Sequence, residues 1–308
     1  MSLFKCLLFA SLVSQTLPAA HGEAHCPGNV ASLTLRLVQG ALIVVPIEIN
    51  HSRPYDFLVD TGAQVTTIEP SLAVELGLKA HGTTGVGGVA TYARTAYSYL
   101  GLIEAGQHSV PDAIAVIQEI TQLKAADSRI RGILGTNFLE HFDLLIDNGR
   151  HILCLDETGV LASTIKGEHI ALAEPHGSKQ DLPFIRPIIV AARLFASDAT
   201  PVLLRLDSGS NAPLLYAADP LVRSKSKGNA SILKRVTNGV EQSFAVLPPQ
   251  DIQIGTHAVT EVSFVVPMNS VGAGPSPRED GLLPTMAFQH VFISRSGGYV
   301  ALEPWSTR

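Results

Sequence analysis

The stretch FLVDTGAQVTTI (residues 57–68) places Asp60 between two apolar runs that have the composition of buried β-strands. A lone carboxylate buried at the end of such a strand is costly unless another group shares its site. The tripeptide Asp-Thr-Gly also ends many strands as an ordinary turn, so by itself it does not decide between a structural and a chemical role. What decides is whether the chain carries a second acid that could meet Asp60.

A second copy of this stretch lies in the other half of the chain. LDSGSNAPLL (206–215) repeats VDTGAQVTTI (59–68), which places Asp207 147 residues after its match, Asp60. Three further pairs share an offset of 149 residues: GTHAV (255–259) with GQHSV (106–110), GLLPT (281–285) with GILGT (132–136), and His290 with His141. Matches that keep one order and a nearly constant offset rarely arise by chance, so the sequence predicts two homologous halves.

Short runs of β-type residues, bounded by Gly, Pro and Asn, fill both halves. Asp147-Asn148-Gly149 between two such runs indicates a hairpin, because Asn-Gly supports positive φ. Only EPSLAVELGL (69–78) has the apolar spacing of a helix. The sequence therefore predicts an all-β fold of two lobes, residues 23–165 and 166–308, each with one short helix and related by a pseudo-twofold axis.

Residues 1–22 have the pattern of an export signal. Lys5 precedes the apolar run CLLFASLV (6–13), and Ala20-His21-Gly22 puts small residues at the two positions that a signal peptidase needs. A buried N-terminal helix is the alternative interpretation. No apolar run in the chain is long enough to span a membrane. We therefore expect a soluble exported protein, either periplasmic or secreted.

Removal of the signal would leave two cysteines, Cys26 and Cys154. In an oxidising compartment they could form one disulfide. Alternatively, Cys26 is a mobile terminal thiol and Cys154 a buried thiol on a strand. The sequence does not separate these two possibilities.

Composition narrows the classes of function. The 308-residue chain carries a formal net charge of −5 and no basic run, which argues against nucleic acid as a partner. GTTGVGG (82–88) lacks the Lys-Ser/Thr of a phosphate loop, no Gly-X-Ser-X-Gly elbow is present, and no histidine pair has zinc-site spacing. We expect no cofactor, no metal and a monomer.

Two aspartates brought together by a twofold relation would have a distinct chemistry. Two carboxylates about 3 Å apart do not both ionise, so the pair keeps one proton. One carboxylate then takes a proton from water while the other donates one to a carbonyl oxygen. Asp60 and Asp207 would thus be equipped to hydrolyse an amide directly.

The neighbouring residues suit such a pair. Gly62 and Gly209 allow a close approach of the two backbones, and the hydroxyls of Thr61 and Ser208 could bond across the axis. Ser210 stands where the first half has Ala63, and we expect its hydroxyl to donate to Asp207 and leave the proton more often on Asp60. An apolar floor would lie beneath the two loops, formed by Ile133, Leu134 and Gly135 and by Leu282 and Leu283.

These motifs resemble the retropepsin-like aspartic proteases, arranged as two β-barrel lobes in one chain as in pepsin. In the first half the resemblance covers Asp60-Thr61-Gly62-Ala63, PSLAVELGL (70–78), GTTGVGG (82–88) and GILGTNFLEHFDLLIDNGRHILCL (132–155). In the second half it covers Asp207-Ser208-Gly209-Ser210 and GLLPTMAF (281–288).

The resemblance implies roles for these residues. Asp60 and Asp207 would be the catalytic dyad of an endopeptidase acting on an extended peptide or unfolded protein, and Thr61 and Ser208 would form an interlocking grip. A flap would close over the substrate, with Gly85, Gly87, Gly88, Tyr92 and Tyr97 in its hairpin and either tyrosine as a substrate contact. A second hairpin around Asn238-Gly239 would be another flap or only a surface loop.

One departure favours a different class of function. Pro284 occupies the place of Gly135, so the second floor loop must differ and Asp207 could be displaced. The alternative is therefore a catalytically silent peptide-binding protein with the same fold.

Overall fold

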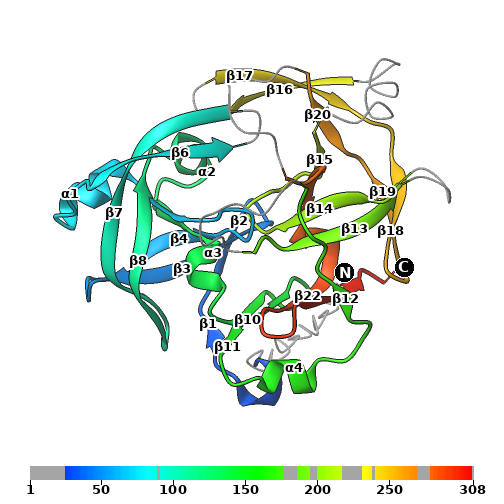
Figure 1. Ribbon diagram of the computed structural model, residues 1–308, viewed down its shortest axis with the longest axis horizontal. Helices are drawn as coiled ribbons and strands as arrows, with labels where there is room; N and C mark the ends of the chain where they lie inside the picture. The colour runs from blue at the N-terminus through cyan, green and yellow to red at the C-terminus, as the bar shows by residue number, and fades with distance from the viewer. Residues whose placement is uncertain are drawn as a thin grey trace, which may run out of the picture.

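The computed structural model describes residues 25–88, 91–176, 186–194, 200–216, 231–237, 240–268 and 278–306. The predicted signal segment lies outside these residues. Three β-sheets dominate the described chain, which confirms the all-β prediction (Figure 1). None of the described helices is both long enough and apolar enough to cross a membrane.

The first half forms an eight-stranded sheet whose central strands carry the first aspartate. In spatial order its strands are β2 (Arg36–Val38), β3 (Leu42–Ile49), β4 (Tyr55–Val59), β9 (Ile130–Leu134), β5 (Thr66–Ile68), β8 (His108–Ile117), β7 (Thr91–Ala105) and β6 (Gly82–Gly88). β9 pairs parallel with β4 and antiparallel with β5, so it lies between the strands that enter and leave the Asp60 loop.

The second half forms a nine-stranded sheet. In spatial order its strands are β16 (Ser231–Thr237), β17 (Val240–Val246), β20 (Val265–Pro267), β15 (Leu214–Leu215), β21 (Gly281–Pro284), β14 (Val202–Asp207), β13 (Ile189–Leu194), β18 (Gln250–Ile254) and β19 (His257–Val262). The order β13-β14-β21-β15-β20-β17-β16 repeats the order β3-β4-β9-β5-β8-β7-β6, and β21 again pairs parallel with one neighbour and antiparallel with the other. This correspondence supports the predicted repeat.

A six-stranded sheet joins the two halves in the lower part of Figure 1. Its strands are β1 (Ser32–Leu33), β11 (Ile152–Asp156), β10 (Asp143–Asp147), β22 (Phe288–Ser294), β23 (Tyr299–Pro304) and β12 (Ile170–Ala171). β10 and β22 pair antiparallel at its centre, so each half supplies three strands. One continuous apolar cluster runs through both halves and fixes the two large sheets relative to each other.

The expectation of one short helix per lobe is wrong. The predicted helix is α1 (Pro70–Glu75), and three more follow in the first half: α2 (Thr121–Ala126), α3 (Thr136–Leu139) and α4 (Val160–Thr164). The described residues from 166 onward contain only the 3-10 helix η2 (Thr285–Ala287), and η1 (Pro27–Asn29) lies near the N-terminus. α3 and α4 have only four and five residues, and α2 (TQLKAA) has a single large apolar residue, so the 3.6-residue period does not show in any of them.

The predicted hairpin at Asp147-Asn148-Gly149 connects β10 and β11. The positive φ, however, falls on His151 (56°), because the turn uses four residues, 148–151. The Asn148 amide instead donates to the backbone carbonyls of Thr285 and Phe288, at 3.0 and 2.9 Å. This turn therefore also ties the first half to the second.

Cys26 and Cys154 form a disulfide, with Cα atoms 6.0 Å apart. Both residues are buried in a small cluster with Leu145, Leu161 and Phe292. The bridge closes a sequence separation of 128 residues and anchors the N-terminal segment to the joining sheet. Of the two possibilities open at the sequence level, the structure has the bridge.

Loss of this bridge should destabilise the protein because the unfolded chain gains freedom. We predict that Cys26→Ala lowers the free energy of unfolding by about 2–5 kcal/mol, measured by guanidinium denaturation. Reduction of the unaltered protein should shift the midpoint in the same direction and leave Cys26→Ala unchanged. An unaltered protein that shows two free thiols on denaturation would contradict the prediction.

Candidate active site

The two aspartates occupy matched positions at the ends of parallel strand pairs. The backbone N–H of Asp60, directly after β4, donates to the Leu134 carbonyl at 3.1 Å. Asp207 ends β14 and lies opposite Pro284 of β21. Pro284, which was expected to disturb the second loop, therefore pairs with Asp207 in regular register and has not displaced it.

Four hydrogen bonds lock the two aspartate loops together. The Thr61 hydroxyl donates to the Leu206 carbonyl at 2.8 Å and accepts from the Ser208 N–H at 3.0 Å. The Ser208 hydroxyl donates to the Val59 carbonyl at 2.8 Å and accepts from the Thr61 N–H at 3.1 Å. Thr61 and Ser208 are both buried, so each hydroxyl satisfies two backbone groups that water does not reach. These are the reciprocal contacts expected from the sequence.

The glycines that follow allow each carboxyl group to lie against the opposite backbone. A Cβ at Gly62 would stand 2.7 Å from the Asp207 carboxyl carbon, and one at Gly209 would stand 2.4 Å from that of Asp60. Contacts below 3.0 Å mean that a side chain at either position would push the opposing carboxyl group out of place. Only glycine therefore lets these two loops approach as they do.

The two carboxyl groups are hydrogen-bonded to each other. Burial raises the pKa of Asp60, and burial together with the charge of Asp60 raises the pKa of Asp207 well above its ordinary value. The causes are those expected of an acid pair that shares one proton.

The hydrogen bonds around the pair favour Asp207 as the protonated acid, and the expected Ser210–Asp207 bond is a wrong prediction. Asp60 accepts from two backbone N–H groups, those of Gly62 and Ala63, at 2.8 and 2.9 Å. Asp207 accepts from the Gly209 N–H at 2.8 Å, whereas the Ser210 hydroxyl donates to the Ala212 carbonyl. Because N–H donors favour the ionised form, Asp60 is the better carboxylate of the two.

The predicted floor residues flank both loops. Leu134 and Leu283 are fully buried in the main core, and Ile133 and Leu282 lie in smaller clusters beside it. Gly135 has a more specific role: a Cβ there would lie 2.5 Å from the Val65 carbonyl carbon, so the first loop closes tightly over it.

Around Gly135 the first half has a polar network. The Asn137 side-chain oxygen accepts from the N–H and the hydroxyl of Thr66 at 2.8 and 2.9 Å, and the Thr136 hydroxyl donates to the Ala63 carbonyl at 2.7 Å. At the positions of Thr66, Gly135 and Asn137 the second half has Pro213, Pro284 and Met286. None of these three can make the same bonds, because proline has no backbone N–H and the methionine side chain has no amide group.

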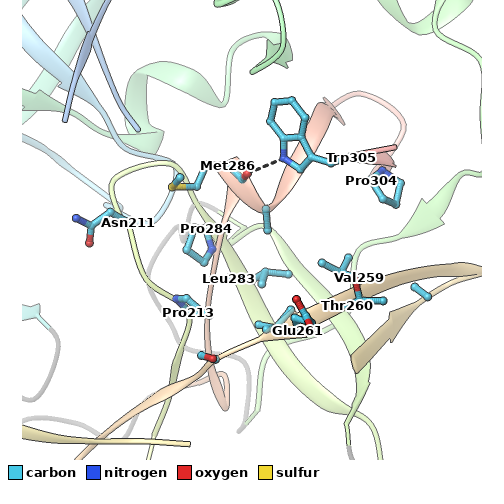
Figure 2. A pocket seen from close by; sticks show the side chains of 14 residues that line it. Asn211, Pro213, Val259, Thr260, Glu261, Leu283, Pro284, Met286, Pro304 and Trp305 are labelled. Carbon is cyan, nitrogen blue, oxygen red and sulfur yellow. Dashed lines mark hydrogen bonds between the residues drawn. The ribbon is translucent and has the colours of Figure 1, made fainter. Parts of the chain in front are cut away.

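A cavity of about 430 Å³ lies in the second half where this closure is missing. Pro213, Pro284 and Met286 surround it in Figure 2, with Val259 and Trp305 further along its wall. The Trp305 indole N–H donates to the Met286 carbonyl at 3.0 Å. The sequence signals for this cavity are Pro213 and Pro284, of which the sequence analysis considered only Pro284, as a threat to the position of Asp207.

The predicted flap hairpin is formed by β6 and β7. Gly87 pairs with Tyr92 and Gly88 with Thr91, so these glycines adjoin the turn, which lies at 89–90 outside the described residues. The half-exposed Tyr92 places its hydroxyl 2.0 Å from where a Gly85 Cβ would lie, and Tyr97 crosses over Gly82 in the same way. Gly85 thus makes room for the Tyr92 ring.

The second predicted hairpin is formed by β16 and β17. Its turn, Asn238-Gly239, lies outside the described residues. β6, β16 and β17 all lie in the upper part of Figure 1, away from the joining sheet.

Sequence reasoning missed Arg205, whose charge lowers the pKa of both Asp60 and Asp207. Its guanidinium donates to the Gly62 carbonyl and to Glu279, both at 2.8 Å. An arginine inside the apolar strand VLLRLD was the available signal. In the described part of the chain, no cluster of three or more His, Cys, Asp or Glu residues is arranged to hold a metal ion.

Comparison with known proteins bears on the first half. Residues 45–138 match the family model of the aspartyl proteases. The match includes Asp60, the α1 helix and the flap hairpin, and ends within α3. It supports an aspartyl protease family and, in general terms, an aspartic-protease-like function. No curated protein sequence matches the chain.

The grip between the loops should contribute measurably to stability. Thr61→Val keeps the shape of the side chain but leaves the Ser208 N–H and the Leu206 carbonyl buried without a partner. We predict a loss of about 2 kcal/mol or more in unfolding free energy, measured by urea denaturation. Thr61→Ser keeps the hydroxyl and serves as the control. Equal stability of Thr61→Val and Thr61→Ser would contradict this assignment.

The acid pair should also make stability depend on pH. Because the native pair binds a proton more tightly than the unfolded chain, stability falls as pH rises from the ordinary aspartate value of 3.8 through the native pKa. Asp207→Asn has no such proton to lose. We predict that its stability rises relative to the unaltered protein by up to about 1.4 kcal/mol per pH unit in that window. Parallel stability curves for the two proteins would refute the shared proton.

Proposed function

We propose that the protein is an aspartic endopeptidase in which Asp60 and Asp207 activate one water molecule between them. The observation that supports it best is the hydrogen-bonded carboxyl pair of Asp60 and Asp207, whose loops are held together by the reciprocal Thr61 and Ser208 contacts. The aspartyl protease family match at residues 45–138 agrees with this proposal. Two lobes related by a pseudo-twofold axis are part of the same proposal.

The unequal hydrogen bonding of the pair assigns the first step. Asp60, ionised and held by two N–H groups, takes a proton from water as the water oxygen attacks the peptide carbonyl. Asp207 donates its proton to the carbonyl oxygen, which gives a neutral tetrahedral diol. The two acids have then exchanged protonation states.

The second step reverses these roles. Asp207, now ionised, takes a proton from one hydroxyl of the diol. Asp60 donates its proton to the amide nitrogen, the C–N bond breaks, and an acid and an amine leave. The pair returns to its starting state with no covalent intermediate.

The substrate we propose is an extended peptide or an unfolded protein segment. The β6–β7 hairpin would cover it, with Tyr92 and Tyr97 as the candidate contacts. We further propose that the protein acts as an exported monomer. The Cys26–Cys154 disulfide agrees with export, because such bridges persist in oxidising compartments.

Substitution of either aspartate tests the proposal directly. We predict that Asp60→Asn and Asp207→Asn each lower kcat/KM for a denatured protein substrate at least about a hundredfold. Asp56→Asn alters a partly exposed aspartate paired with Arg36 and should leave activity near that of the unaltered protein. A peptide with a statine-type hydroxyl at the scissile bond should inhibit. Full activity in either dyad variant would rule out the shared mechanism.

The alternative function, a silent peptide-binding protein, has one structural argument in its favour. The second half lacks the polar closure found around Gly135, and a cavity takes its place. Incubation with a mixed peptide library separates the two functions. Binding without new peptide termini would favour the silent module, and new termini that disappear in Asp60→Asn would favour the peptidase.

A further inference from the structure

A buried ion pair lies beside the dyad and has no counterpart in the first half. Arg205 and Glu279 have side chains that are only 15% and 3% exposed, and they are joined at 2.8 Å. A second nitrogen of Arg205 donates to the Gly62 carbonyl, which belongs to the aspartate loop of the other half. Arg205 therefore links three segments: β14, the chain before β21 and the first aspartate loop.

The matched position in the first half is apolar. Leu58 precedes Asp60 by two residues, as Arg205 precedes Asp207, and it packs in a cluster with Val44 and Ile130. A buried ion pair is rarely more stabilising than apolar side chains of similar size, because desolvation offsets the attraction. Stability alone thus gives little reason for an arginine here, and a role at the neighbouring site gives a better one.

The charge of Arg205 acts on both acids of the dyad. It lowers the pKa of Asp60 and of Asp207, against the upward effect of burial. In the described part of the chain, Arg205 also interacts with two other titratable groups, Glu279 before β21 and Tyr216 after β15. Burial and the charge of Glu279 raise the pKa of Tyr216, so its phenol stays neutral. Among Arg205, Glu279 and Tyr216, the positive charge therefore comes from Arg205.

We propose that Arg205 is a positioning residue for the dyad: it holds the Gly62 loop against the second half, and its fixed charge sets the pH range in which the pair carries one proton. Glu279 orients the guanidinium for this task. The inference rests on the proposed peptidase function for its kinetic consequences, but its effect on proton binding is independent of turnover.

Direct titration of the acids tests the charge. Carboxyl carbons of Asp60 and Asp207 are followed by NMR in protein labelled with ¹³C-aspartate, and the two signals are assigned from Asp60→Asn and Asp207→Asn. The double variant Arg205→Met/Glu279→Gln removes both charges and leaves no buried carboxylate unpaired. We expect the dyad to titrate at higher pH in this variant than in the unaltered protein.

Two controls isolate the arginine. Glu279→Gln keeps Arg205 and should not shift the dyad titration upward. Arg53→Met removes an exposed arginine that precedes β4 and pairs with Glu75, and it should not shift the dyad titration at all. An unchanged titration in the folded double variant, or an equal upward shift in Glu279→Gln, would overturn the proposal.

Kinetics test the positioning role. Arg205→Lys keeps the charge but replaces the two-pronged donor, so both limbs of the pH profile should stay in place while kcat falls roughly ten- to a hundredfold. In the double variant both limbs should move to higher pH. Unaltered kcat in Arg205→Lys would contradict the role. Absence of any peptidase activity in the unaltered protein would reject the proposed function, and the NMR titration would still decide the effect of the charge.

Discussion

The reciprocal bonding of Thr61 and Ser208 is the constraint on which the rest of the site depends. Each hydroxyl bridges the opposite backbone, so neither loop can shift without leaving buried polar groups unpaired. With the loops fixed, Gly62 and Gly209 bring each carboxyl group against the other half, and burial then makes two full negative charges untenable. The raised pKa values of Asp60 and Asp207 thus result from the way the two sheets meet, and they do not depend on any one residue alone.

Much of this arrangement was predictable from the sequence because the chain repeats itself. Matched motifs at a nearly constant offset predicted the partnership of Asp60 with Asp207 and the glycine that follows two residues after each, and the short runs of β-type residues predicted the all-β class. Those features depend on residue identity at a few positions, which a sequence displays directly. The helices α3 and α4 were missed because they are too short to show a period, and α2 was missed because it has only one large apolar residue.

The details that escaped prediction depend on where side chains point. Ser210 was expected to donate to Asp207, but its hydroxyl turns to the Ala212 carbonyl two residues on. Whether Cys26 meets Cys154 depends on how β1 pairs with β11, which no local pattern reveals. The cavity behind Pro284 likewise follows from bonds that the second half lacks, and a sequence shows such losses only once the matched network is known.

The two halves therefore have the same strand order but differ in several residues around the two aspartates. Ala63 and Ser210, Gly135 and Pro284, and Leu58 and Arg205 are matched pairs of different residues around one pair of acids. In each case the first half keeps the tighter or more apolar choice. The surroundings of Asp60 and Asp207 are therefore unequal: Asp60 accepts from two backbone N–H groups and Asp207 from one.

A neutron diffraction structure of crystals held at mildly acidic pH, above the ordinary aspartate pKa, tests the shared proton most directly. We expect density for one deuteron between the carboxyl groups of Asp60 and Asp207, bonded to Asp207. Two deprotonated carboxylates, separated by water and beyond hydrogen-bond distance, would contradict the central claim.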